Sequence, residues 1–73
     1  MKKKIKICDG QGFRIGDILH FKSAPHVRGI VRDCGGFVSR VYFFDVYGDI
    51  TPQTLTLSNF DLLSQLSHIE RAR

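Results

Sequence analysis

Short clusters of turn-forming residues divide this chain into segments of about ten residues, a spacing typical of small all-β folds. The clusters are rich in Gly, Pro, Asn, Asp and Ser, which favour turns. The segments between them are rich in β-branched and aromatic residues, which favour strands. The clusters are DGQG at 9–12, SAP at 23–25, DCGG at 33–36, YGD at 47–49 and SNFD at 58–61. The pattern predicts a small antiparallel barrel or sandwich.

Length and composition indicate one ordinary globular domain. The chain has 73 residues, too few to close a second core, so residues 1–73 are expected to form a single domain with 1–4 as a basic tail. No apolar run approaches the roughly 20 residues that cross a bilayer. The basic start MKKK is not followed by the apolar stretch of a signal peptide. We therefore expect a cytoplasmic protein without membrane contact, in which Cys8 and Cys34 are reduced thiols rather than one bridge.

Alternation of apolar and polar residues predicts one buried face for each strand. The segment 4–8 alternates lysine with isoleucine, which suits a first or edge strand. Gly29 lies inside the segment 26–33, where a glycine predicts a bulge or a close backbone approach. The segment 37–46 is apolar on both faces, so it needs cover on both or a bend between layers. The apolar faces hold Ile5, Ile7, Leu19, Phe21, Val27, Val31, Val41, Phe43, Leu55 and Leu57.

The C-terminal segment permits two structures. Ser58 and Asp61 have the spacing of a capping box, and apolar residues follow at helical spacing, so a helix from about Asn59 is one alternative. The other is a 3₁₀ turn over 59–61, followed by a short strand over 62–66 that closes a barrel. We favour the turn and strand slightly, because a family resemblance described next ends in that way.

A spaced set of turn and core residues runs through most of the chain. It begins with Phe13, Gly16, Asp17, Lys22, Pro25, Gly29 and Val31, and continues through Asp45, Gly48, Leu55, Phe60 and Leu63. This order resembles SH3-like barrels, in particular small bacterial SH3-like proteins of the YodC type, and more loosely KOW modules. The resemblance implies a five-stranded SH3-like barrel with a 3₁₀ turn near Asn59, whose loop over 22–29 borders the ligand surface. The KOW likeness implies contact with RNA or with a transcription complex, but Val27 and Arg28 replace the usual glycine and lysine.

Three arginines and a tyrosine are expected to share one face of the sheet. If the segments 26–33 and 37–46 pair through the turn between them, these side chains stand opposite the core, where arginine binds phosphates or carboxylates and an aromatic ring stacks on a base or a proline. The alternative is a solvated face with Asp33 and Asp45 as partners. The predicted ligand-binding surface consists of Lys22, His26, Arg28, Arg32, Arg40 and Tyr42.

The net charge of +4 comes from the two ends of the chain. Between Ile7 and Glu70, five basic residues stand against seven acidic ones. The N-terminal lysines can contact phosphate without specificity, or they can simply solubilise the terminus or guard an edge. These lysines are Lys2, Lys3, Lys4 and Lys6.

Candidate metal and catalytic residues lack the spacing that their chemistry requires. Cys8, His20, His26 and Cys34 are zinc-ligand types, but a loop lies between His20 and His26, and the two cysteines are isolated rather than closely paired. Cys34 has no histidine near it in sequence. We expect no metal, no cofactor and no catalysis. The predicted function is a binding module for a protein or peptide, with nucleic-acid binding through the arginines and lysines as the alternative. A homodimer through the lysine-flanked edge is an open option.

Overall fold

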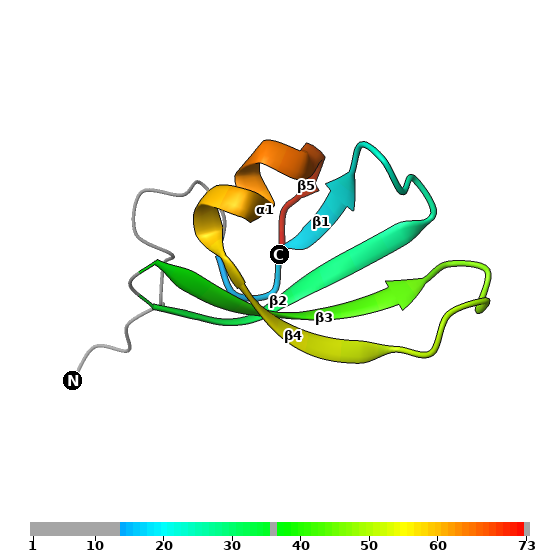
Figure 1. Ribbon diagram of the computed structural model, residues 1–73, viewed down its shortest axis with the longest axis horizontal. Helices are drawn as coiled ribbons and strands as arrows, with labels where there is room; N and C mark the ends of the chain where they lie inside the picture. Colours follow the sequence, from blue (N-terminus) through cyan, green and yellow to red (C-terminus); the bar gives the residue numbers. More distant parts are fainter. Residues whose placement is uncertain (1–13, 36, 73) are drawn as a thin grey trace.

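The computed structural model describes residues 14–35 and 37–72, which form one antiparallel sheet and one short helix. Figure 1 shows β2, β3 and β4 crossing the lower half of the molecule, with α1, β1 and β5 above them. The sheet is five-stranded, in the order β4-β3-β2-β1-β5. The all-β prediction is confirmed at this level. The elements are β1 (Ile18–Phe21), β2 (Val27–Gly35), β3 (Val38–Asp45), β4 (Gln53–Ser58), α1 (Asn59–Gln65) and β5 (Leu66–Glu70).

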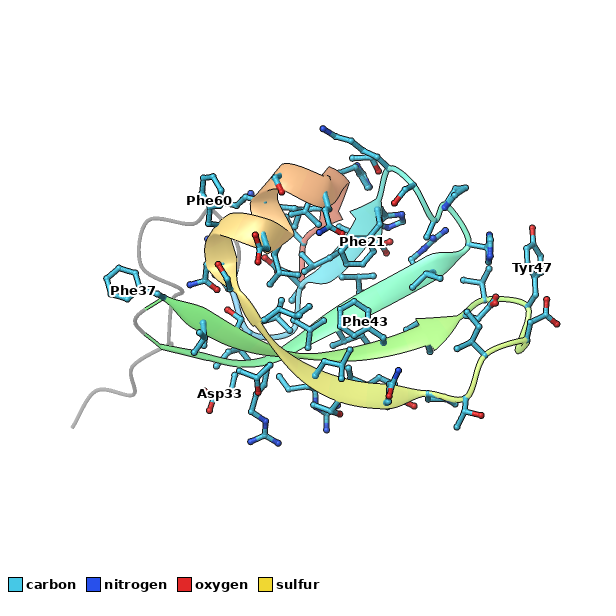
Figure 2. All side chains as sticks on the ribbon, in the orientation of Figure 1. Phe21, Asp33, Phe37, Phe43, Tyr47 and Phe60 are labelled. Atoms are coloured by element: carbon cyan, nitrogen blue, oxygen red, sulfur yellow. The ribbon has the colours of Figure 1, made fainter. Side chains whose placement is uncertain are left out.

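The core lies between the sheet and α1, on the face predicted from the alternation. Leu19, Val31 and Val41 are fully buried, and Leu62 of α1 is buried against them. The rings of Phe21 and Phe43 face each other in this interior with centroids 5.6 Å apart (Figure 2). Burying apolar side chains from β1, β2, β3 and α1 together is what holds the helix on the sheet.

The sequence predicted either a β-bulge or a close backbone approach at Gly29, and the structure has both features at different positions of β2. A Cβ at Gly29 would lie 2.7 Å from Val41 Cγ1, so the glycine marks a close approach. The bulge lies further along β2, because Val31 pairs with Val41 while Asp33 pairs with Arg40. Arg32 is therefore the extra residue of a β-bulge.

The turn predictions are confirmed in part. Gly48 has φ of +75°, and the Asp45 carboxylate accepts a hydrogen bond from the Tyr47 amide, which fixes the turn over 47–49. The cluster at 33–36 was predicted as a turn, but β2 continues through Gly35. Its pairing with Val38 carries the ladder up to the end of the hairpin.

The C-terminal segment combines parts of both predicted alternatives. Ser58 is the N-cap of α1, and its Oγ accepts a hydrogen bond from the Asp61 amide at 3.4 Å. The 3₁₀ turn near Asn59 is therefore wrong: this segment is an α-helix, because the cap and the buried Leu62 stabilise a full helical segment. A strand does follow, but over 66–70 rather than 62–66, and it pairs with β1.

The buried carboxylate of Asp17 ties distant segments together. The Asp17 carboxylate accepts hydrogen bonds from the amides of Arg14 and Ala72 and from the Arg71 guanidinium. Burial alone raises the pKa of Asp17, but these hydrogen bonds and the positive charge of Arg71 more than offset it, so the pKa lies below its usual value. Asp17 thus joins the start of β1 to the end of β5. The strand predicted over 4–8 lies outside the described residues.

Candidate binding face

The strand register gathers aromatic, apolar and basic side chains on the sheet face opposite the core. One row across β1, β2 and β3 joins Ile18, Ile30 and Tyr42, and the next joins His20, Arg28 and Phe44. Arg32 and Arg40 stand beyond these rows, toward the end of the β2–β3 hairpin. We call this surface the arginine face. It consists of Ile18, His20, Arg28, Ile30, Arg32, Arg40, Tyr42 and Phe44.

An aromatic pair forms the centre of the arginine face. Tyr42 and Phe44 are two residues apart on β3, so their side chains leave the same side of the strand, and their ring centroids lie 6.1 Å apart. Both are half-buried. The Arg32 guanidinium carbon lies 5.9 Å from the centroid of the Tyr42 ring, within range of a cation–π interaction. The bulge is what places Arg32 beside that ring.

The same bulge brings opposite charges together at one end of the face. Arg32 and Asp33 stand opposite Arg40, because two residues of a bulged strand face one residue of its partner. Figure 2 shows Asp33 below the sheet, on the side away from α1. Asp33 and Arg40 also line an open hollow of about 250 Å³, together with Cys34, Gly35, Val38 and Thr56. This end of the face can therefore bind ligand groups that donate hydrogen bonds as well as groups that accept them.

Arg28 is directed toward the β1–β2 loop rather than away from the sheet. Its Nη1 donates to the carbonyl oxygens of Pro25 and Val27. Arg28 therefore fastens the loop to β2, which is a structural task, and the loop around Pro25 is a strand connection as the sequence suggested. The exposed arginines of the face are Arg32 and Arg40.

Two histidines border the face at its β5 side. His20 of β1 pairs with His68 of β5, and their rings meet edge to face with centroids 4.5 Å apart. The His20 Nε2 also lies 3.1 Å from the Glu70 carboxylate. The pairing of His20 with His68 joins residues far apart in the chain, so no local sequence pattern predicts it.

Lys22 and His26, which were predicted on the same surface, lie in the β1–β2 loop instead. The His26 carbonyl accepts a hydrogen bond from the Val46 amide, and its ring lies 5.9 Å from the ring of Tyr47. Tyr47 is 75% exposed and projects from the β3–β4 loop in Figure 2. The structure therefore divides the predicted site in two: the arginine face, and a loop end that holds Lys22, His26 and Tyr47. The lysines of the N-terminal tail lie outside the described residues.

Sequence reasoning overlooked part of the arginine face. Alternation along β3 places Phe44 beside Tyr42, and this signal was available in the sequence. Ile18 and His20 could be placed on this face only once the pairing of β1 with β2 was known, and that pairing depends on loop length and register rather than on any local pattern. The position of Tyr47 beside His26 depends on a contact between two loops, which the sequence does not predict.

The described residues hold no group of three His, Cys, Asp or Glu side chains that could bind a metal. Cys34 is disulfide-bonded, so the expectation of a free thiol is wrong at this position, and Cys8 lies outside the described residues. A thiolate nucleophile at Cys34 is therefore not available while this bond is intact.

A second cavity of about 250 Å³ lies on the core side, between α1 and the sheet. Its lining is largely apolar, with the exposed Asp61 also contributing. The apolar lining residues are Phe21, Ala24, Val27, Phe43, Leu57 and Leu62. Since Phe21 and Leu62 also belong to the buried core, we interpret this cavity as the open side of the interior.

Comparison with known proteins identifies no relative: no protein family, curated protein or solved structure matches the chain. In the described part of the chain there is no helix with the length and apolar character of a membrane span.

Proposed function

We propose that this protein is a small non-catalytic binding module of the SH3-like class that binds a protein or peptide partner through the arginine face. The observation that carries the proposal is the half-buried pair Tyr42 and Phe44, set between apolar neighbours and the exposed Arg32 and Arg40. The described helix packs on the opposite side of the sheet, where Leu62 is part of the core.

The composition of this face favours a protein partner. Tyrosine, phenylalanine and arginine are enriched at the centres of protein interfaces, where a rigid ring supplies contact area at low cost in entropy. Arg32 is already held over the Tyr42 ring, so less conformational freedom is lost when a partner binds. Arg40 can offer a forked pair of donors to a carboxylate or a peptide carbonyl. We expect the partner to combine apolar side chains with acidic groups.

The strand order supports assignment to the SH3-like class. β1 lies between β2 and β5, so the first and last strands of the described chain are neighbours, as a small barrel of this class requires. The connection between β4 and β5 is the short helix α1, in the place where the resemblance implies a 3₁₀ turn.

Nucleic-acid binding is the second candidate, and the same face favours it for a different reason. Exposed guanidiniums beside aromatic rings can bind phosphates while a base stacks on a ring. Asp33 opposite Arg40 and Glu70 beside His20 place negative charge at this face and its border, and for this reason we place this candidate second.

The test is selection of peptides from a random displayed library on the immobilised protein, followed by affinity measurements with the selected peptides. Tyr42→Ala should weaken binding by about tenfold or more, which corresponds to about 1.4 kcal/mol. Tyr47→Ala is the matched control, because it removes an exposed ring that lies off the face. Peptides that bind Tyr42→Ala as well as the wild type would refute the assignment. Salt-sensitive binding of labelled single-stranded RNA that is lost in Arg32→Ala would favour the second candidate.

A further inference from the structure

In the part of the chain that the structure describes, strand β4 is an edge of the sheet that lacks the usual protection. In the described residues it pairs with β3 alone and ends the strand order. Its six residues, QTLTLS, include no charged residue, no proline and no glycine. Sheet edges are normally protected by charge, proline or bulges, since their free backbone groups can pair with another chain. The opposite edge strand, β5, carries Glu70, and its pairing with β1 has a register shift.

The register shows which backbone groups of β4 point outward. The Asn59 amide donates to the Phe37 carbonyl at 2.8 Å, which continues the β3–β4 register by one step and marks a hydrogen-bonded pair. Hydrogen-bonded pairs alternate along an antiparallel ladder, so Leu55 and Val41 form another one. The amide and carbonyl groups of Thr54 and Thr56 therefore face away from β3.

The apolar side of the same edge is also incompletely covered. Leu55 pairs with the fully buried Val41 and points to the core side of the sheet, yet it remains 41% exposed. A further strand beyond β4 would cover this side chain and satisfy the outward groups of both threonines.

We propose that this edge binds a second copy of the chain, by antiparallel pairing of β4 with β4 about a two-fold axis at Leu55. A two-fold interface must be self-complementary, and the order Thr54-Leu55-Thr56 reads the same in both directions. Each Thr54 would pair with the partner's Thr56 and exchange two hydrogen bonds with it. The two leucines would form the central non-hydrogen-bonded pair, in which side chains lie closest.

Charge also permits a second copy at this position. The net charge of +4 comes from the two ends of the chain, whereas the six residues of β4 carry no charge, so pairing two β4 strands brings no like charges of this strand together. The sheets of the two protomers would become continuous, and both arginine faces would lie on the same side. The dimer does not depend on what the arginine face binds.

Sedimentation velocity from micromolar to millimolar protein tests the proposal. We expect a concentration-dependent dimer for the wild type. Leu55→Lys should weaken it by roughly tenfold or more, because the apolar contact between the two leucines is lost and two ammonium groups would meet directly across the axis. Phe60→Lys is the matched control: Phe60 is 78% exposed on α1, so the same change of charge and loss of an apolar ring should leave the dimer intact. A wild type that stays monomeric at millimolar concentration, or a Leu55→Lys variant that still dimerises, would overturn the proposal.

Crosslinking tests the register even if Leu55→Lys unfolds. The Cα atoms of the central pair should lie about 4.5 Å apart, within the range of a disulfide. Two copies of Thr54 should lie diagonally, about 7 to 8 Å apart, which a disulfide does not span without backbone movement. On oxidation, Leu55→Cys should give a covalent dimer on a non-reducing gel, and Thr54→Cys should not exceed the wild-type background. Equal crosslinking of both variants, or of neither, would refute the axis at Leu55.

Discussion

Gly29→Ala tests how tightly the centre of the sheet is packed. The new Cβ would lie 2.7 Å from Val41 Cγ1 and 3.3 Å from Phe21 Cε2, whereas carbon atoms in contact normally lie about 3.5 to 4.0 Å apart. Val41 is fully buried and β-branched, so its methyl group cannot rotate away without meeting another neighbour. The strands must shift by several tenths of an ångström.

The expected loss of stability follows from two opposing terms. Overpacking a core costs about 1 to 3 kcal/mol, while replacing glycine by alanine stabilises by about 0.4 to 1 kcal/mol through the unfolded chain. We expect a net loss of about 1 to 2 kcal/mol, which for a domain of this size lowers Tm by roughly 5 to 15 °C. Urea unfolding followed by far-UV circular dichroism measures the free energy, and the slope m should not change.

Two variants sharpen this test. Gly35→Ala places a methyl group in open space on the same strand, so we expect stability to be unchanged or up to about 1 kcal/mol higher. Val41→Ala removes the atom that the new Cβ would meet. The double variant Gly29→Ala with Val41→Ala should therefore be more stable than the sum of its single changes predicts, by about 1 kcal/mol. Equal stability of the Gly29 and Gly35 variants, or strict additivity with Val41→Ala, would refute the close-approach argument.

Substitutions at three further positions test the polar contacts. Asp17→Asn should lower the free energy of unfolding by about 2 to 3 kcal/mol at neutral pH. Because the native pKa of Asp17 is lowered, this difference from the wild type should persist above about pH 4 and disappear as the pH falls through the native pKa. Urea unfolding at several pH values measures the difference, and a difference that stayed constant with pH would contradict the argument. Ser58→Ala should cost only about 0.5 to 1 kcal/mol, since the N-cap bond to the Asp61 amide is long at 3.4 Å; Ser58→Asp, which keeps a cap acceptor, should restore the stability in thermal unfolding. Ser39→Ala removes the hydroxyl that donates to Asn59 Oδ1 inside the fold and should cost about 1 to 2 kcal/mol by urea unfolding, and an unchanged midpoint would show that this buried bond adds nothing.

The β4 edge and the arginine face belong to the same sheet but present different chemical groups. The face offers its side chains, so a partner bound there is selected by the chemistry of Tyr42, Phe44 and the arginines. At the edge, the proposed pairing would use backbone groups, and the symmetric order around Leu55 would give it selectivity for a second copy. Leu55 points to the core side of the sheet and Tyr42 to the opposite side, so each variant has its own readout: dimerisation for Leu55→Lys and ligand affinity for Tyr42→Ala.

Local patterns were sufficient for the strand content and for most of the core. Side chains alternate strictly along a strand, so the order of apolar and polar residues in 17–22 and 26–33 already predicted Leu19 and Val31 on the buried side. The turn at Gly48 and the N-cap at Ser58 depend on a few neighbouring residues, and both were readable in the same way.

The tertiary structure alone decided which distant residues meet. The bulge at Arg32 sets the register of the β2–β3 hairpin, and only that register places Arg32 over Tyr42 and opposite Arg40. Arg28 is not one of the exposed arginines, because its guanidinium donates to a loop carbonyl. His26 lies beside Tyr47 in the loops rather than on the arginine face. The pairing of β5 with β1 and the ties from Asp17 to Ala72 join the two ends of the described chain. A sequence records the preferences of each short segment, whereas these contacts depend on the summed packing of segments that are far apart in the chain.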